Sequence, residues 1–323
     1  VFIALMRGYG DTITPMLVMF GSVVLNIALD PFLIFGWGPF PALGIEGAAI
    51  ATVFSRALAL IVGLAIMFRG VRGVRINLRD MVPDASYLRR LLRIGLPASI
   101  EGTGRAVSMN LLLFIVALFP DPVVAAYGIG TRVFSVVFLP AIAVARGVET
   151  MTGQNIGSGK PDRAERAANL AAKTLFAVLS VAGVVVFLVP EPIVSVFVGA
   201  EQADAGRVVA VGSQFLRVVA LTFGFIGIMR AYTGSFRGAG KTLTAAAISV
   251  LMLGIVRFPI AWVAAGRIGE TGIWLSFAVS NVVGAAVAYA WYRRGAWRRG
   301  DLTDRGVAGD IDEPVAAAES TDD

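Results

Sequence analysis

The chain has 323 residues, of which 57% are hydrophobic and only 15% are charged. Soluble domains usually carry about 25% charged residues, so this composition indicates a membrane protein. The sequence contains no cysteine and no histidine. These two absences exclude disulfides, thiolate nucleophiles, histidine-based catalytic triads and imidazole proton relays.

The formal net charge of +6 combines two regions of opposite sign. Residues 301–323 hold eight acidic residues against Arg305 alone, which gives −7, so residues 1–300 carry +13. The basic residues lie in short segments between long apolar runs. This distribution favours a positively charged membrane face over a nucleic-acid partner. We expect the acidic tail, residues 296–323, to be disordered.

Eight apolar segments are long enough to be membrane-spanning helices, which need roughly 20 residues. They lie near residues 15–36, 47–68, 94–119, 123–149, 168–199, 208–232, 243–265 and 271–292. Barrel strands need only about 10 residues of strict alternation, so the length of these segments predicts helices. Residues 70–93 and 154–168 are polar and basic, and are predicted to be connections or surface helices. The expected fold class is an all-α, polytopic membrane helical bundle.

The basic residues also predict an orientation. Alternate connections hold Arg7, then six arginines from 69 to 90, then Lys160, Arg163 and Arg166, then Arg237 and Lys241, and finally four arginines from 293 to 299. The opposite connections hold only Arg207 and Arg267. The positive-inside rule places the first set in the cytoplasm. We therefore expect a multi-pass protein of the cell (plasma or inner) membrane with a cytoplasmic C-terminus.

The chain repeats part of its own sequence. Residues 7–14 (RGYGDTIT) match residues 237–244 (RGAGKTLT) at five of eight positions, with an offset of 230. Gly44, Gly47, Ser55, Arg69 and Gly70 recur with an offset of 225 as Gly269, Gly272, Ser280, Arg294 and Gly295. Two copies in the same orientation are typical of secondary transporters.

The repeat predicts how the chain is divided. The second copy starts near residue 88, and 88 − 230 = −142, so about 140 residues are expected upstream if the two copies are equal in length. On this basis residues 1–69 are the last two helices of an N-terminal lobe and residues 70–90 a cytoplasmic linker between lobes. Residues 91–295 are a six-helix C-terminal lobe, followed by the tail. We expect an N-terminally truncated carrier whose full form has twelve helices, about eight of them in this chain.

Several motifs, in this order, carry a family resemblance. They are RGYGDTITP at 7–15, NIALDP at 26–31, GIEGAAIAT at 44–52, RIGLPASIE at 93–101, AAYGIGTRV at 125–133, GQNIGSGKPDRAER at 153–166 and SFRGAGKT at 235–242. With these motifs the chain resembles the multidrug and toxic compound extrusion (MATE) transporters over essentially residues 1–295. The resemblance implies two six-helix lobes and export of organic compounds against an inward flow of H⁺ or Na⁺.

Asp30 is the most informative single residue, because it interrupts the apolar segment 15–36. An ionisable group inside a membrane costs a few kcal/mol unless it is paired, hydrated or protonated. Asn26 lies one turn earlier on the same helical face, and their oxygens together suit a hard cation such as Na⁺. Alternatively, desolvation could keep a proton on Asp30. The structural alternative is an aspartate that ends the helix before Pro31.

The resemblance extends this site. In one MATE branch an Asn-x-x-x-Asp helix faces a cation site in the first lobe, and Thr52 matches a hydroxyl on the next helix that faces the same site. The structural alternative for Thr52 is a hydroxyl bonded to its own backbone. The same branch has a further essential aspartate on a helix that precedes this chain. We therefore predict cation coupling at Asp30, Asn26 and Thr52, with H⁺ or Na⁺ as the coupling ion, no cofactor and no other metal.

Glu101 and Arg105 lie four residues apart on the helix opened by Pro97, so they are predicted to form an ion pair. Another MATE branch has a glutamate on this helix, but that position corresponds to Arg105 here. The same branch has an aspartate where this chain has Ile226. Both departures count against a second cation site, and pairing is the predicted role of Glu101.

Further charged residues interrupt the apolar segments, namely Arg132, Arg146, Glu149, Arg217, Arg230 and Arg257. Arg146 and Glu149 have the spacing of an ion pair. The remaining arginines could extend to the membrane surface, bind lipid phosphate or line a hydrated cavity. A cavity with many arginines would suit anionic or zwitterionic substrates better than cations.

The function predicted from the sequence is a secondary active antiporter that exports organic, drug-like compounds by alternating access. The expected partners are the lipid bilayer and a small organic substrate, with no nucleic acid, and the protein is expected to be a monomer. The alternative is a flippase for lipid-linked oligosaccharide or another amphipathic lipid. An enzyme is not expected, because no histidine, cysteine or clustered acidic motif supplies catalytic groups.

Overall fold

The computed structural model describes residues 2–70, 76–77, 85–199 and 204–298. These residues form helices and no strand, which confirms the all-α prediction. Contacts divide the chain into two compact units, Val1–Leu88 and Arg89–Asp323. Most of the predicted linker and the tail beyond residue 298 lie outside the described residues, and the assignment of the units to lobes stays a prediction.

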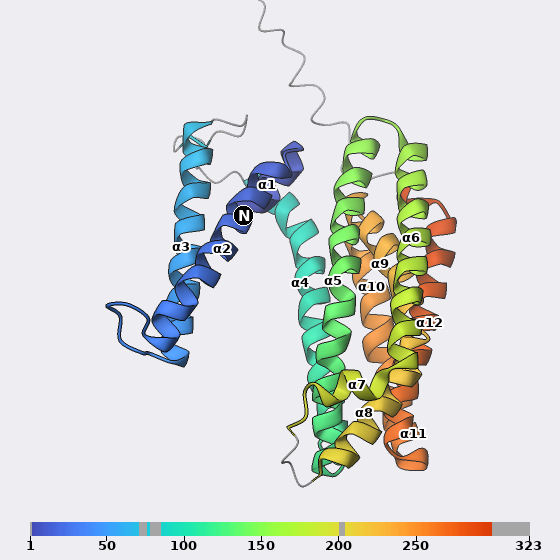
Figure 1. The fold of residues 1–323 in the computed structure, drawn as a ribbon. Coiled ribbons are helices and arrows are strands. Elements are labelled where there is room, and N and C mark those ends of the chain that lie inside the picture. Colours follow the sequence, from blue (N-terminus) through green and yellow to red (C-terminus); the bar gives the residue numbers. More distant parts are fainter. Residues whose placement is uncertain (1, 71–75, 78–84, 200–203, 299–323) are drawn as a thin grey trace, which may run out of the picture. The chain divides into compact units, whose positions relative to one another are not determined.

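The first unit contains α1 (Phe2–Tyr9), α2 (Ile13–Phe35) and α3 (Ile45–Arg69) (Figure 1). Asp11 caps α2, since its Oδ1 accepts the backbone N–H groups of Ile13 and Thr14 at 3.0 and 2.9 Å. α2 and α3 pack closely because Gly47 has no side chain. A Cβ at Gly47 would lie 2.1 Å from the carbonyl oxygen of Leu33.

The structural alternative for Asp30 is wrong, because α2 does not end before Pro31. The helix continues through Pro31 to Phe35, and Gly36 ends it with a φ of 72°. Proline lacks an N–H, so the carbonyl of Ile27 receives no helical hydrogen bond from this position. Asp30 therefore lies inside α2, five residues or roughly 8 Å before its C-terminal end.

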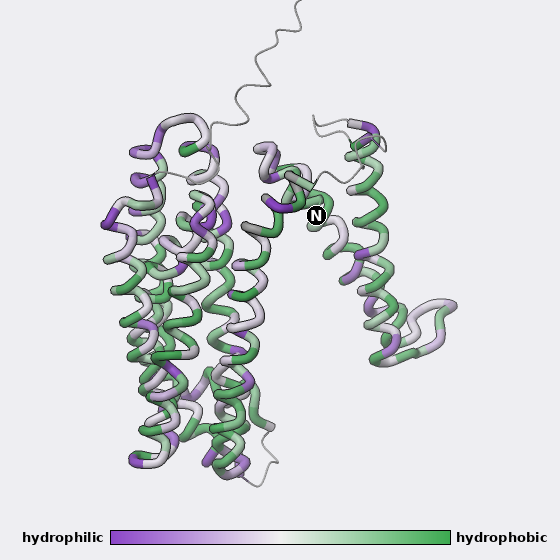
Figure 2. The backbone as a smooth tube through the Cα atoms, turned by 180° about the vertical axis from the view of Figure 1, so that it is seen from behind, coloured by the Kyte–Doolittle hydropathy of each residue, from purple (hydrophilic) through white to green (hydrophobic). Residues whose placement is uncertain are grey.

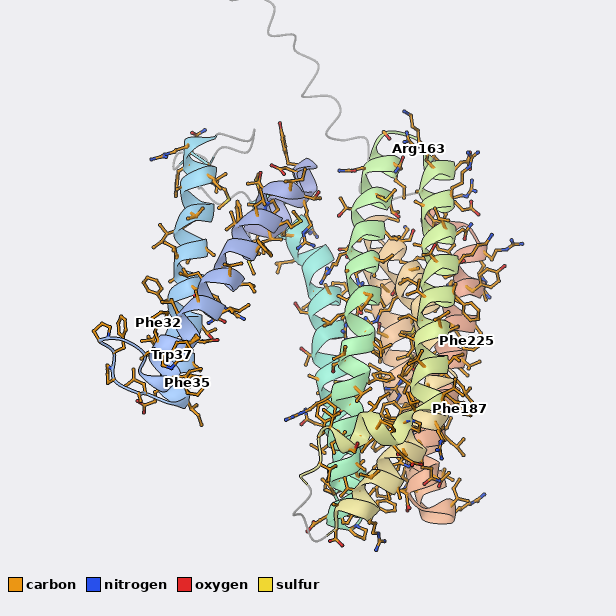
Figure 3. The ribbon with its side chains drawn as sticks, viewed as in Figure 1. Phe32, Phe35, Trp37, Arg163, Phe187 and Phe225 are labelled. Carbon is orange, nitrogen blue, oxygen red and sulfur yellow. The ribbon has the colours of Figure 1, made fainter. Side chains whose placement is uncertain are left out.

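Aromatic side chains gather where α2 turns into α3. Figure 3 shows Phe32, Phe35 and Trp37 together at this end of the unit. The ring of Trp37 lies 6.4 Å from those of Phe32 and Phe35. All three side chains are exposed. Exposed aromatic rings at the end of a membrane helix are typical of the interface between lipid and water.

The second unit is a helical bundle that begins with α4 (Ala85–Val116), whose first four residues precede the boundary. Its long helices are α5 (Asp121–Gly157), α6 (Pro161–Leu188), α8 (Ala205–Ala220), α9 (Phe223–Gly238) and α12 (Glu270–Arg293). The shorter elements are α7 (Pro190–Ser195), α10 (Thr242–Val250), a π-helix (Leu251–Arg257), α11 (Phe258–Ile268) and a 3-10 turn (Ala296–Arg298). Segment 154–168, predicted to be a connection or surface helices, is mostly helical, since only residues 158–160 separate α5 from α6.

α9 lies at the centre of this bundle and packs against α5, α6 and α12. Gly227 lets α9 approach α6, because a Cβ there would lie 2.8 Å from the Cβ of Leu175. Between α8 and α12 the ring of Phe215 stacks on Trp274 at 4.3 Å, and both side chains are fully buried. These contacts give the second unit its own apolar core.

Within the described residues, six helices are long and apolar enough to cross a membrane, and α8 with α9, bent by 52°, would make a seventh span. The prediction of eight spans also counted α4, which is long enough but interrupted by Glu101, Arg105 and Asn110. Large apolar side chains remain exposed along the helices of both units. Figure 2 shows hydrophobic residues along the length of these helices. Such surfaces need lipid or further protein to cover them, so the chain is a multi-pass membrane protein.

The sequence repeat has a structural counterpart. Three glycine pairs related by the repeat have a positive φ: Gly10 and Gly240, Gly44 and Gly269, and Gly70 and Gly295. The close helix approach at Gly47 also recurs, since a Cβ at Gly272 would lie 2.3 Å from the carbonyl carbon of Ala264. The hairpin of α2 and α3 thus corresponds to the hairpin formed by residues 242–268 and α12.

The described part of the chain ends against the start of α6. The ring of Trp297 stacks on Tyr292 at 4.6 Å, and Arg298 pairs with Asp162 at 2.9 Å and with Glu165. The hydrogen bond to Glu165 raises the pKa of Arg298. Arg298 is therefore charged at every physiological pH, and its ion pairs hold this end of the chain against α6.

Candidate functional site

The first unit brings Asn26, Asp30 and Thr52 together. The Nδ2 of Asn26 donates to Oδ1 of Asp30 at 3.3 Å and points to Oγ1 of Thr52 at 3.5 Å. All three side chains are half-buried. α2 supplies the first two through its i,i+4 spacing, and the packing of α3 on α2 supplies the third.

Thr52 bonds to its own helix and also faces Asn26, while its role in binding a cation stays a prediction. Its hydroxyl donates to the carbonyl oxygen of Ala48 at 2.8 Å, which satisfies its own helix. The same oxygen keeps a free lone pair on the side that faces Asn26. The backbone bond therefore orients Thr52 as an acceptor toward the other two side chains.

The arrangement offers one carboxylate and two neutral oxygen donors. Rotating the Asn26 amide turns its Oδ1 toward the point that Asp30 and Thr52 already face. Oxygen ligands with a single negative charge suit a monovalent hard cation, and a proton on Asp30 would serve the same electrostatic purpose. The described residues contain no group of three or more acidic side chains that could hold a metal ion.

Ser22 extends this polar face and was not among the site residues predicted from the sequence. Its hydroxyl donates across the helix pair to the carbonyl oxygen of Ser55 at 2.9 Å, and both side chains are buried. A cavity of about 410 Å³ lies beside them, lined otherwise by apolar residues of α2 and α3. The i,i+4 spacing of Ser22, Asn26 and Asp30 was the available signal, since it puts all three on one face of α2.

The second unit holds a different cluster around Glu101, which is 3% exposed. Its Oε1 lies 3.3 Å from Arg105 Nη2 and 2.7 Å from Arg237 Nη2, and Arg237 Nε donates to Oε2 at 3.2 Å. The Ser249 hydroxyl donates to Oε1 at 2.9 Å. The pair with Arg105 was expected from spacing. The contacts of Arg237 and Ser249 arise from tertiary packing, and only the place of Arg237 in the repeated Arg-Gly turn singled it out.

A cavity of about 410 Å³ lies beside this cluster and is lined by further charged residues. Arg146 and Glu149, which line it, form the expected ion pair at 3.2 Å. Arg230 also lines it, and its Nε is buried without a hydrogen-bond partner among the described residues. The guanidinium of Arg230 lies 5.6 Å from the ring centre of Phe138.

Arg257 does not extend to the membrane surface. It ends the π-helix and is 7% exposed. Its Nε donates to Ser280 Oγ at 2.8 Å and its Nη2 donates to Asn281 Oδ1 at 2.9 Å. Its guanidinium also lies 4.3 Å from the ring centre of Phe277. Within the described residues no carboxylate pairs with Arg257, so neutral oxygens and an aromatic face hold this buried charge.

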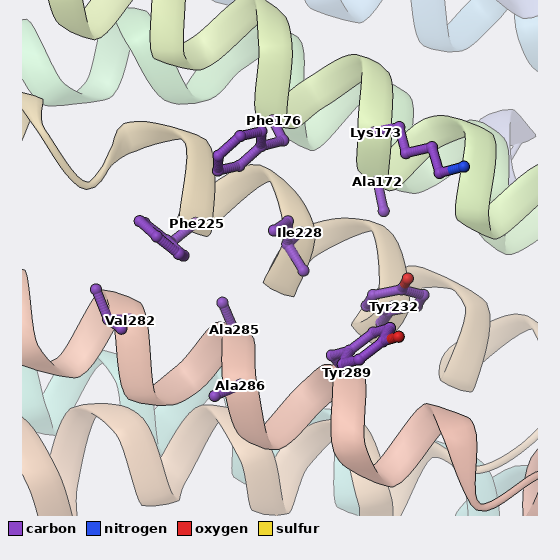
Figure 4. A pocket seen from close by; sticks show the side chains of 10 residues that line it. All are labelled: Ala172, Lys173, Phe176, Phe225, Ile228, Tyr232, Val282, Ala285, Ala286 and Tyr289. Atoms are coloured by element: carbon purple, nitrogen blue, oxygen red, sulfur yellow. The ribbon is translucent and has the colours of Figure 1, made fainter.

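A third cavity, of about 380 Å³, lies between α6, α9 and α12 (Figure 4). Its walls are apolar and aromatic, with Lys173, Tyr232 and Tyr289 at one end. The Tyr232 hydroxyl donates to Asn169 Oδ1 at 3.0 Å. This cavity suits an apolar group, but it has no cluster of ionisable side chains to perform coupling.

Comparison with known proteins assigns the architecture. The family model MatE matches residues 97–263, which is just over half of the chain. The chain belongs to the MatE family. It is 30% identical over 307 residues to the probable multidrug resistance protein NorM of Thermotoga maritima, which covers 93% of the chain and 64% of that protein. It is 28% identical to the FAD transporter of Shewanella oneidensis, over 88% of the chain and 62% of that protein.

A solved structure confirms the MATE fold. The Vibrio cholerae MATE transporter VcmN in its bent form aligns with a TM-score of 0.80 at 22% identity, over 93% of this chain and 66% of that one. This MATE chain spans a little less than two thirds of the length of the curated relatives it matches.

Proposed function

We propose that the protein is a secondary active antiporter that exports an organic compound by alternating access, coupled to inward movement of H⁺ or Na⁺. The observation that carries the proposal is the Asn26–Asp30–Thr52 cluster inside an apolar helix pair. A cation bound there, or a proton on Asp30, neutralises the carboxylate. Neutralisation changes the cost of exposing this face to lipid or to water, so ion binding shifts the balance between conformations.

Family membership supports transport rather than an enzymatic activity. Relatives named as multidrug transporters and one named as an FAD transporter leave the substrate open. Their names lend no support to the alternative of a lipid flippase. We further propose that the protein acts as a monomer, with its C-terminus in the cytoplasm.

The test is coupled efflux by the protein expressed from its complete gene and reconstituted in liposomes. One arm imposes a pH gradient without Na⁺, and the other imposes a Na⁺ gradient at equal pH. We expect one gradient to drive efflux of a fluorescent organic compound and Asp30→Asn to abolish it. Glu46→Gln is the matched control, because Glu46 is an exposed carboxylate in the first turn of α3. Undiminished coupling in Asp30→Asn would refute the role of Asp30.

A further inference from the structure

We propose that the cavity beside Glu101 binds an anionic group of the transported compound, a phosphate or diphosphate ester, and that Arg230 is its principal ligand. The proposal rests on the transport function above and adds the chemical class of substrate. Three features of the cavity support the proposal: its net positive charge, the pairing of its two acidic residues with arginines, and the buried Nε of Arg230 without a partner.

The cavity has an excess of positive charge. Four arginines line it, Arg105, Arg146, Arg230 and Arg237, together with two acids, Glu101 and Glu149. Four positive and two negative groups leave a charge of +2. The cavity volume of about 410 Å³ falls in the range of small-molecule sites and is ample for the charged group of a ligand.

The two acidic residues of the cavity are already paired with arginines and leave no free carboxylate for a cation. Glu101 accepts hydrogen bonds from Arg105, Arg237 and Ser249, so its Oε1 alone has three donors. Glu149 pairs with Arg146. An added cation would have to displace an arginine, whereas an added anion meets positive charge that is only partly neutralised.

Arg230 has no acidic partner among the described residues, although it lies in the middle of α9. Its buried Nε lacks any hydrogen bond there. Buried donors without partners are rare in folded proteins. A guanidinium presents paired N–H donors whose geometry matches a phosphate. A phosphate oxygen in the cavity would give this arginine the acceptor that the protein itself does not supply.

The backbone adds to the same field. Thr242 lines the cavity and is the first residue of α10, which continues into the π-helix. The N-terminal end of a helix carries partial positive charge and favours anions. The +2 charge of the side chains and this helix end together match a group with up to two negative charges, such as a phosphate ester.

Binding to the purified protein from the complete gene, in neutral detergent, tests the proposal. FAD is the probe, and riboflavin is its control because it keeps the isoalloxazine ring but lacks the diphosphate and the adenosine. We expect FAD to bind, Arg230→Gln to weaken binding at least ten-fold, and riboflavin affinity to be the same in both proteins. Arg267→Gln removes an exposed arginine at the end of α11 and should change FAD affinity less than two-fold.

Two further arms keep the outcome decisive. If Arg230→Gln does not give a monodisperse protein, Arg230→Lys keeps the charge but loses the paired donors, and should weaken FAD binding several-fold. Titration with short-chain phosphatidylglycerol separates a transported phosphate ester from a lipid headgroup. No FAD binding, equal binding by both arginine variants and wild type, or Arg230-dependent binding of the lipid alone would overturn the proposal.

The outcomes of this binding test are distinguishable from the outcomes of the efflux test of the proposed function. Asp30→Asn should lose gradient-driven efflux and keep FAD binding. Arg230-dependent FAD binding without any gradient-driven transport would leave the site in place and refute the antiporter. Gradient-driven efflux of another compound without FAD binding would support the antiporter and refute the phosphate site.

Discussion

Glu101 and Arg237 form a two-point ion pair across 136 residues of sequence, with Nε and Nη2 of the arginine donating to the two carboxylate oxygens at 3.2 and 2.7 Å. The carboxylate is 4% exposed and the guanidinium side chain 15%. This contact joins α4 to the C-terminal end of α9 inside the second unit. Arg105 and Ser249 complete the shell, so a single carboxylate holds three helical segments together.

Replacing Glu101 with Gln should destabilise the protein strongly, because Arg105 and Arg237 would lose their shared counter-charge. Breaking a buried ion pair from one side costs about 3–5 kcal/mol. Glu191→Gln is the matched control, since Glu191 pairs with Arg217 at 3.2 Å but both side chains are largely exposed. Exposed pairs contribute about 0–1 kcal/mol. Thermal unfolding in detergent measures both, and equal losses would contradict the structural role of Glu101.

The Thr52 hydroxyl should matter for ion coupling rather than for folding. Thr52→Val keeps the shape of the side chain but removes the oxygen that faces Asn26, so we expect a coupling-ion affinity at least several-fold weaker. Thr52→Ser keeps the hydroxyl and should behave like wild type. The measurement is the ion concentration that gives half-maximal efflux. Thr52 would be only structural if the Val variant matched the Ser variant in this value.

Asn281 should stabilise the buried charge of Arg257. Asn281→Ala leaves an Arg257 donor and the Thr222 hydroxyl without their partner, since Asn281 Nδ2 donates to Thr222 Oγ1 at 3.0 Å. A buried donor left unpaired costs about 1–3 kcal/mol. Asn281→Asp instead supplies a carboxylate to the guanidinium and should be more stable than Asn281→Ala at pH 7. Chemical unfolding ranks the variants, and the opposite order would mean that Arg257 is satisfied without residue 281.

The bend between α8 and α9 should depend on Gly183 of α6. A Cβ there would lie 2.3 Å from the carbonyl oxygen of Ala220, the last residue of α8. Because backbone atoms cannot move aside easily, we expect Gly183→Ala to cost about 1–3 kcal/mol through overpacking. Gly147→Ala is the control in α5, where a Cβ meets nothing within 4 Å, and it should stabilise that helix by up to about 1 kcal/mol. Unfolding midpoints that fall equally would contradict the packing argument.

Features that depend on local spacing could be predicted from the sequence. Long apolar runs identified the spans, and the i,i+4 or i,i+3 rule found Asn26 with Asp30, Glu101 with Arg105 and Arg146 with Glu149. Each of these pairs lies on one helix, so periodicity alone brings its members together.

Features that depend on tertiary packing could not be predicted in this way. The 52° bend follows Leu221 without a proline to mark it. The contacts of Arg237 with Glu101 and of Arg257 with Asn281 join helices whose mutual rotation no periodic pattern specifies. The burial of Arg257 was not predictable for the same reason, because it depends on Ser280 and Asn281 from another helix.

The two copies of the repeat have different charges at similar depths. Asp30 follows Gly10 by 20 residues, and Arg257 follows Gly240 by 17, a difference of less than one helical turn. Arg257 contacts Ser280, whereas its first-copy counterpart Ser55 accepts a hydrogen bond from the neutral side chain of Ser22. A permanent cation cannot be loaded and released during a transport cycle. In the antiporter proposed above, the described residues would therefore bind the coupling ion in the first copy of the repeat and not at the matching depth of the second.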